Sequence, residues 1–323
     1  MTFGSYGYNY YGQGACLDEW CGIKDILFSR DYNIYPGITK ETFFEHDDFE
    51  YKRSGSKYIW SNHTIKKKPK NDSNKIIFGC SPFCYAEEMI DAESPIEEKY
   101  EVVFLPRSDY GVFLNSNNKI KFVDYLFSIN LKNPIFISHP NDLKFWSFIK
   151  FEDFSKKLYC IGESSLDRNW TYKLIRLLKK SSCIYNPIFS SNVVYSSFMG
   201  KKNKFYNEFS MHISYKSNKI IDNRTFVKSL KSERWNNFMN YLEEVFSDDN
   251  LTDDKKFFIY QFLSLDLIKT PNQLLEDLNF LSEKEYDMIF LQSNDRYENL
   301  MRKSKKFVYS NPSNKTLDFY EDL

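Results

Sequence analysis

The chain has 323 residues, with 44 Lys+Arg against 44 Asp+Glu, and 18% of its residues are aromatic. Domains usually hold ~100–150 residues, so this length predicts at least two packed units. A mean hydropathy of -0.55 with 42% hydrophobic residues is typical of globular proteins and excludes disordered, collagen-like and disulfide-scaffold classes. The balanced charge argues against nucleic acid as a partner, because domains that bind phosphate backbones carry a basic excess.

The sequence predicts a cytoplasmic protein. No apolar run approaches the ~18–20 residues of a membrane span, and residues 2–6 do not form a signal segment. The six cysteines do not predict a metal site, since Cys16 and Cys21, like Cys80 and Cys84, are not spaced as CxxC and have no accompanying histidine pair. We expect Cys160 and Cys183 to be small buried hydrophobes.

Residues 1–96 are rich in Gly, Tyr and acidic side chains and show few clear elements, apart from short strands expected at 57–60 and 75–78. The basic run at 66–70 indicates an exposed loop between these strands. A solvated turn is the preferred interpretation of that run, with an acidic or membrane-surface partner as the alternative.

From residue 97 to about 224 the pattern alternates strand and helix, which is typical of a parallel sheet with crossover helices. Strands are expected at 102–105, 134–138, 158–161, 182–185 and 204–206, and helices at 120–130, 142–149, 170–180 and 191–199. This predicts a doubly wound unit, and such units bind ligands beyond the carboxyl ends of their strands.

Residues 225–323 are expected to be helical. Thr252 precedes an apolar run at 257–268, Thr270-Pro271 places a cap and a first-turn proline before another helix, and Ser282 with Glu285 forms a capping box. The apolar faces of these helices are interpreted as core or docking surfaces.

Polar residues follow four successive strands of the predicted sheet, where an anionic, hydroxyl-rich ligand would bind. They are Arg107 and Ser108, then His139 and Pro140, then Gly162 and Glu163, then Asn186, Ser190 and Ser191.

The serine pair stands where a helix begins. Hydroxyls and free N–H groups there, with the helix dipole, can hold a phosphate, although Ser is also an ordinary N-cap residue. His139, one of only 4 histidines, could donate to that phosphate or protonate a leaving oxygen. Glu163 could accept from a ribose or base, or simply cap the next helix.

Other schemes for this chemistry lack their motifs. There is no G-x-x-x-x-G-K-[ST], no G-x-G-x-x-G after a strand and no G-x-S-x-G, so kinase, dehydrogenase and serine-hydrolase functions lose their main support. The donor-like region also has no D-x-D near a strand end, so no metal ion or other cofactor is expected, and His139, the helix N-terminus and Arg107 would neutralise the leaving phosphate.

The order of His139-Pro140 and then Ser190-Ser191 resembles the HP and serine motifs of bacterial GT-B sialyltransferases and related Kdo or nonulosonate transferases. Residues 98–207, about a third of the chain, are similar to the donor domain of surface-polysaccharide glycosyltransferases. The resemblance implies a GT-B-like α/β fold with two Rossmann-like units and a helical C-terminal region: an acceptor-side domain at 1–96, a donor domain at 97–224 and helices at 225–323. It also implies that His139, Ser190 and Ser191 cradle the phosphate of a CMP-sugar.

The same families place an acidic catalytic base in the N-terminal domain, often in a D/E-D/E-G motif. This chain has Asp18 and Glu19 but inserts Trp20 and Cys21 before Gly22, so the choice between the two acids stays open. Adjacent carboxylates that are partly buried raise one pKa towards neutrality, which suits a base. Two acids on a solvated loop are the alternative.

The expected function is therefore transfer of a sugar from a nucleotide donor, CMP-linked by preference, to a bacterial surface glycan such as lipopolysaccharide or capsule. Peripheral contact with the inner membrane or with polysaccharide-assembly proteins would fit this role. The alternatives are a GT-B nucleotide-sugar epimerase or hydrolase, and a non-catalytic glycan- or nucleotide-binding protein.

Overall fold

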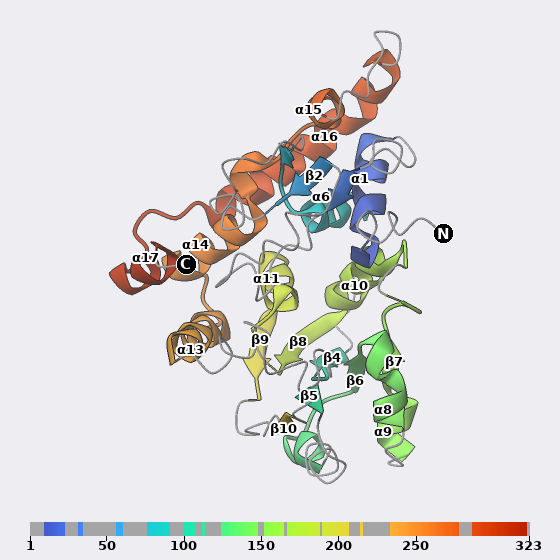
Figure 1. Cartoon of the computed structure of the whole chain (residues 1–323), viewed down its shortest axis with the longest axis vertical. Coiled ribbons are helices and arrows are strands. Elements are labelled where there is room, and N and C mark those ends of the chain that lie inside the picture. Colours follow the sequence, from blue (N-terminus) through green and yellow to red (C-terminus); the bar gives the residue numbers. More distant parts are fainter. Residues whose placement is uncertain are drawn as a thin grey trace. The chain divides into compact units, whose positions relative to one another are not determined.

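A computed structural model describes residues 10–22, 32–34, 56–60, 76–90, 100–106, 112–113, 124–147, 152–164, 167–187, 189–206, 214–215, 233–277 and 286–321 (Figure 1). The chain packs into two compact units. Unit 1 comprises Met1–Pro95, Ser165–Ile175 and Leu251–Leu323, and unit 2 comprises Ile96–Ser164 and Arg176–Asn250. The residues at 225–323, expected as one helical region, are thus divided between the two units.

Unit 2 is built on a five-stranded sheet whose strands are all parallel, in the order β7-β6-β4-β8-β9. The strands are β4 (Tyr100–Phe104), β6 (Pro134–Ser138), β7 (Leu158–Cys160), β8 (Ser181–Asn186) and β9 (Lys202–Phe205). The expected α/β class with a parallel sheet is therefore confirmed. Continuous apolar runs form the central strands because both faces of a parallel sheet are covered.

The strand order makes this sheet a doubly wound one. The first three strands in the chain run outwards from β4 on one side, and the fourth and fifth start again on its other side, so the order reverses between β4 and β8. Reversal of this kind defines the topological switch point of Rossmann-like sheets, where the crevice for ligands forms.

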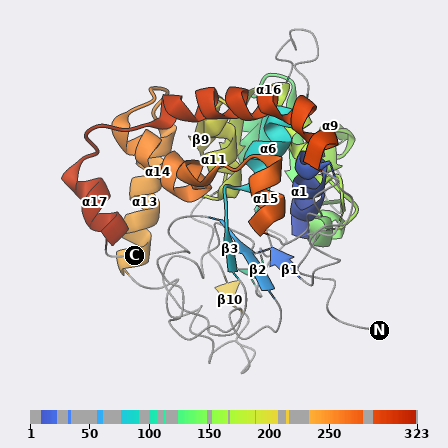
Figure 2. The ribbon, with the colours of Figure 1, turned by 90° about the horizontal axis from the view of Figure 1, so that it is seen from above.

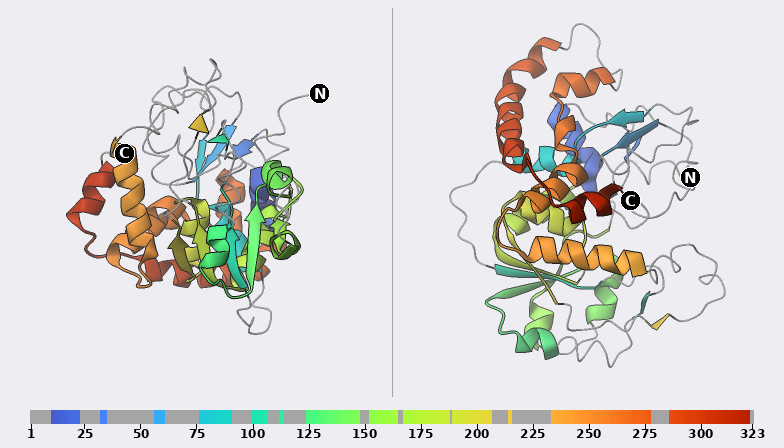
Figure 3. Two further views of the ribbon diagram at one scale, coloured as in Figure 1. Left: turned by 90° about the horizontal axis from the view of Figure 1, so that it is seen from below. Right: turned by 90° about the vertical axis from the view of Figure 1, so that its left-hand side faces the viewer.

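Helices cover both faces of the sheet (Figures 1 and 3). One face packs against the helical residues 124–128, α8 (Leu143–Ser147, after the 3-10 turn η4, Pro140–Asp142) and α9 (Glu152–Lys156). There Phe136 contacts Phe154 at 4.8 Å between ring centroids, and Trp146 and Leu126 join the same core. α11 (Ser191–Phe198) lies on the opposite face, and α13 (Glu233–Ser247) packs against β9. A separate antiparallel pair joins β5 (Val112–Phe113) to β10 (Ser214–Tyr215).

Unit 1 contains a second, smaller parallel sheet, which Figure 2 shows with its three strands side by side. The strands are β1 (Tyr32–Ile34), β2 (Ser56–Ile59) and β3 (Ile76–Phe78). The 3-10 turn η2 (Tyr10–Gly12) leads into α1 (Gln13–Cys21), which packs against α6 (Pro82–Met89). Both helices and β1 went unrecognised in the sequence.

The remaining helices of unit 1 come from the C-terminal part of the chain. They are α14 (Asp253–Leu263), η5 (Leu265–Leu267), α15 (Pro271–Asp277), α16 (Tyr286–Ser304), η6 (Lys305–Phe307) and α17 (Asn314–Glu321). Thr252 caps α14 as expected, because its hydroxyl accepts a hydrogen bond from Lys255 N at 3.3 Å. The run expected to continue to Ile268 ends at Leu263, since Ser264 takes a left-handed conformation. The capping box at Ser282 and Glu285 lies outside the described residues.

α10 (Trp170–Lys179) connects β7 to β8, and its first residues belong to unit 1 while its last belong to unit 2. Across the described part of the chain, no helix is both long enough and apolar enough to span a membrane.

Candidate functional site

The strand ends that the sequence predicted as ligand-binding lie side by side at the carboxyl edge of the five-stranded sheet. Phe104 pairs with Ile137, Ser138 pairs with Cys160, and Asn186 pairs with Phe205. β4 lies between β6 and β8, so the segments that follow those two strands flank the end of β4 on either side of the switch point. The edge therefore forms the candidate site.

The end of β6 is a tight turn around His139. The Ser138 hydroxyl donates to the His139 carbonyl at 3.0 Å, and Asp142 N donates to the same carbonyl at 2.9 Å. Ser138 and Asp142 are buried, whereas His139 and Pro140 are half-buried. The turn fixes the backbone at His139, and the residue as a whole is partly accessible to solvent.

The end of β8 leads through a short loop to α11. Ser190 is the N-cap in an extended conformation (φ -157, ψ 174), and its side chain makes no capping hydrogen bond. Its carbonyl accepts from Val193 N at 3.0 Å, so the first turn of the helix is formed. Ser190 and Ser191 are half-buried, which keeps the start of α11 within reach of solvent.

α13 anchors this loop from one side. Its buried Glu243 carboxylate accepts a hydrogen bond from Phe189 N at 3.2 Å, and Phe246 contacts the Phe189 ring at 5.1 Å between centroids. A loop amide is thereby held by an internal acid, directly before Ser190. Nothing in the sequence pattern pointed to this long-range contact.

Asn186 does not line the edge, contrary to the sequence-based assignment. It is fully buried, and its Nδ2 donates to Asn203 Oδ1 at 2.9 Å. The Ser196 hydroxyl also donates to Asn203 Oδ1 at 2.9 Å, and Asn203 Nδ2 donates to the Ser197 hydroxyl at 3.0 Å. Asn186 thus belongs to a polar network that joins α11 to β8 and β9.

The other residues predicted to bind the nucleotide-sugar donor lie farther from the end of β4. Gly162 is buried, its carbonyl accepts from the Cys160 thiol at 2.9 Å, and Glu163 is exposed. Both follow β7, an edge strand separated from β4 by β6. Arg107 and Ser108 lie outside the described residues.

The predicted base residues lie on α1 in unit 1, and not on a loop. Asp18 is only 2% exposed and its carboxylate pairs with the Arg168 guanidinium at 3.3 Å, whereas Glu19 is exposed. Gly22 ends the helix in a left-handed conformation (φ 67). Trp20 and Cys21, which interrupt the D/E-D/E-G pattern, are the last residues of this helix. Gly22 follows them because helix C-termini favour glycine at that position.

In unit 1 a strand end is also followed by a helix start, from β3 to α6, but the backbone amides between them are occupied by other residues of the chain. Cys80 N donates to the Leu267 carbonyl at 3.1 Å, and Ser81 N donates to the Leu263 carbonyl at 3.0 Å. The Tyr58 hydroxyl donates to the Cys80 carbonyl at 2.8 Å. A side chain at Gly79 would meet the Tyr58 ring, since an added Cβ would lie 2.1 Å from its hydroxyl. The amides of Cys80 and Ser81, at the start of α6, are therefore already used within the unit.

The cysteines are free thiols and most are buried. Burial raises the pKa of Cys16 to about 12, with smaller contributions from Glu19 and Asp18, and it raises the pKa of Cys80 strongly. Among the described residues, no group of three His, Cys, Asp or Glu side chains gathers as metal ligands.

No protein family, no curated protein and no solved structure matches this chain.

Proposed function

We propose that the protein is a glycosyltransferase that takes its sugar from a nucleotide donor, CMP-linked by preference, and adds it to a surface-glycan acceptor. The donor would bind at the carboxyl edge of the sheet in unit 2. The proposal includes the GT-B fold, in which two Rossmann-like units make up the enzyme.

The observation that carries the proposal is the strand order of the sheet in unit 2. It places the switch point between β4 and β8, with Ser190 in the segment after β8 and His139 after β6, the other neighbour of β4. Strands lie about 4.8 Å apart, so two strand spacings are about 10 Å, which suits a phosphate with its attached ribose. Rossmann-like sheets bind nucleotides at this place.

The contrast between the two units supports unit 2 as the donor side. In unit 1, carbonyls of Leu263 and Leu267 occupy the amides after β3. The N-cap serines Ser81 in unit 1 and Ser190 in unit 2 both make no capping hydrogen bond, but Ser81 is fully buried, whereas Ser190 is half-buried. A phosphate placed there would gain the hydroxyl and the positive end of the helix dipole.

The proposed reaction assigns roles to one carboxylate of α1, to His139 and to the start of α11. A carboxylate takes the proton from an acceptor hydroxyl, whose oxygen forms a bond to the anomeric carbon of the sugar. The bond from that carbon to the donor phosphate breaks, and the nucleotide leaves with the electron pair. His139 and the start of α11 would stabilise the charge on the leaving phosphate without a metal ion.

Of the two candidate bases, Glu19 is the better one. The Asp18 carboxylate is almost fully buried and is held by Arg168, so an acceptor hydroxyl has little access to it. Glu19 is exposed on the same helix. A general base must come within hydrogen-bond reach of the proton that it removes.

The proposal is tested by thermal-shift and calorimetric titration with CMP, UDP, GDP and TDP, with and without EDTA. A ligand that binds only the folded state raises its apparent stability. We expect CMP to bind in EDTA, and His139→Ala and Ser190→Ala to weaken binding about tenfold or more. Glu19→Gln should keep nucleotide binding and abolish sugar transfer.

Ser313→Ala is the matched control for the serine variant. Ser313 caps the helix α17 in unit 1, where its hydroxyl accepts from Thr316 N at 3.2 Å. This variant should lose about 1 kcal/mol of stability without any change in nucleotide affinity. Binding of no nucleotide by the wild type, or equal affinity in the His139 and Ser190 variants, would refute the proposal. Release of free sugar from a CMP-sugar without acceptor would instead identify a hydrolase.

A further inference from the structure

The ladder between β4 and β8 lacks a backbone donor at the switch point. Leu105 N donates to the Ile137 carbonyl of β6 at 2.8 Å, so the backbone groups of Leu105 face β6 and, by alternation, those of Phe104 face β8. Val103 pairs with Tyr185, which places residue 187 as the next donor for the Phe104 carbonyl. That residue is Pro187, which has no N–H.

Tyr206 supplies the missing donor. Its hydroxyl donates to the Phe104 carbonyl, and its own N donates to the Asn186 carbonyl at 3.3 Å. The side chain is 4% exposed and belongs to the core that includes Leu105 and Tyr185. Burial, with a smaller contribution from Tyr125, raises the pKa of Tyr206 well above its ordinary value, so the hydroxyl keeps its proton at neutral pH.

The bond joins the two strands that separate at the switch point. Tyr206, the residue directly after β9, thus bonds both strands: its side chain bonds the last residue of β4 and its backbone bonds the last residue of β8. Beyond Asn186, the proline would leave these strand ends without a ladder bond. The Tyr206 phenol therefore links the end of β4 to the segment after β9, one step beyond the last ladder pair of β4 and β8, Val103 with Tyr185.

We infer that Tyr206 is a positioning residue for the nucleotide site, fixing the distance between the ends of β4 and β8. The inference rests on the proposed function, since a ligand at the switch point would contact both strand ends. A site whose contacting groups are already held in place binds its ligand more tightly, because less conformational freedom is lost on binding. Loss of the Tyr206 bond should therefore act on affinity as well as on stability.

The test compares Tyr206→Phe with Tyr58→Phe. Each change removes one buried tyrosine hydroxyl that donates to a backbone carbonyl near the carboxyl end of a parallel strand: Tyr206 to Phe104, the last residue of β4, and Tyr58 to Cys80, two residues after β3. Both variants should lower the melting temperature by similar amounts. Calorimetric titration with CMP, well below both melting temperatures, should show about tenfold weaker binding for Tyr206→Phe and unchanged binding for Tyr58→Phe.

A rescue variant separates the bond from the bulk of the side chain. Pro187→Ala gives β8 a backbone N–H at the position that faces the Phe104 carbonyl. The double variant Tyr206→Phe with Pro187→Ala should recover most of the lost affinity. It also replaces the single variant if Tyr206→Phe does not fold.

Hydrogen exchange tests the inference even without a nucleotide. Amides of Leu105 and of residues 189–193 should exchange faster in Tyr206→Phe and at the wild-type rate in Tyr58→Phe. Equal affinity and equal exchange in wild type and Tyr206→Phe would overturn the inference. Failure of the wild type to bind any nucleotide would overturn the proposed function, and faster exchange would then leave Tyr206 as a purely structural clamp.

Discussion

The polar network beneath α11 gives the sharpest prediction about stability, through the substitution Asn203→Ala. Asn203 is 2% exposed and accepts hydrogen bonds at 2.9 Å from both Asn186 and Ser196. After the substitution, Asn186 Nδ2 keeps only the Ile184 carbonyl at 3.4 Å, while the Ser196 hydroxyl keeps the Val193 carbonyl at 3.0 Å. One buried donor is thus largely orphaned, at a cost of about 1–3 kcal/mol, and a small cavity adds to it. We expect a total loss of about 2–4 kcal/mol.

Urea denaturation followed by circular dichroism measures this loss, with Lys202→Ala in the same strand as control. Lys202 is exposed and pairs only with the exposed Asp249, so its removal should leave the midpoint nearly unchanged. The double variant Asn186→Ala with Asn203→Ala should lose less than the sum of the two single variants, because the two side chains share one bond. An unchanged midpoint in Asn203→Ala, or strict additivity, would refute the network.

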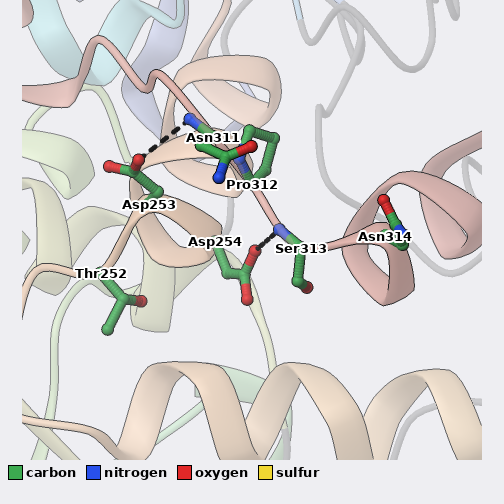
Figure 4. A pocket seen from close by; sticks show the side chains of 7 residues that line it. All are labelled: Thr252, Asp253, Asp254, Asn311, Pro312, Ser313 and Asn314. Carbon is green, nitrogen blue, oxygen red and sulfur yellow. Dashed lines mark hydrogen bonds between the residues drawn. The ribbon is translucent and has the colours of Figure 1, made fainter.

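Two further predictions concern unit 1. Gly12→Ala should cost more than Gly22→Ala by thermal unfolding: both glycines have left-handed backbones, but an added Cβ at Gly12 would lie 2.6 Å from the Arg168 carbonyl, whereas at Gly22 nothing lies within 4 Å. Equal costs would mean that the Gly12 contact can relax. At Asp253, hydrogen bonds from Lys256, Asn311 and Ser310 lower the pKa to about 2, so its stabilising effect is present above pH ~4 and is lost as pH falls towards 2. Figure 4 shows the bond from Asn311 N to the Asp253 carboxylate. Asp253→Asn should flatten the dependence of melting temperature on pH in that window, and an unchanged slope would contradict the assignment.

The sheet of unit 2 could be predicted from the sequence because its signals are local. Central strands of parallel sheets are short apolar runs; β6 begins at Pro134, because proline is tolerated at the first residue of a strand, and Gly162 follows the edge strand β7. His139 and Ser190 were placed at strand ends for the same reason. Their position beside the switch point follows from the strand order, which no local pattern specifies.

The parts that were missed depend on contacts between distant residues. The helix α1 begins at a left-handed Gly12 and buries polar residues such as Gln13 and Asp18, so it lacks a clear amphipathic pattern. Asn186 looked like a ligand contact because it follows a strand, yet its partner Asn203 lies on another strand. The Tyr206 bond similarly joins residues that are far apart in the chain.

The backbone bonds that close the strand end of unit 1 constrain how the chain folds during synthesis. Cys80 and Ser81 find their acceptors only at Leu267 and Leu263. At about 5–20 residues per second, a ribosome needs roughly 10–40 s to reach those acceptors after passing Ser81. The five strands of the parallel sheet in unit 2 emerge within that interval, so this sheet can form before the helices that complete unit 1 are synthesised. A chaperone that binds nascent chains would therefore act chiefly on residues 1–95, and variants that weaken α14 should increase that dependence.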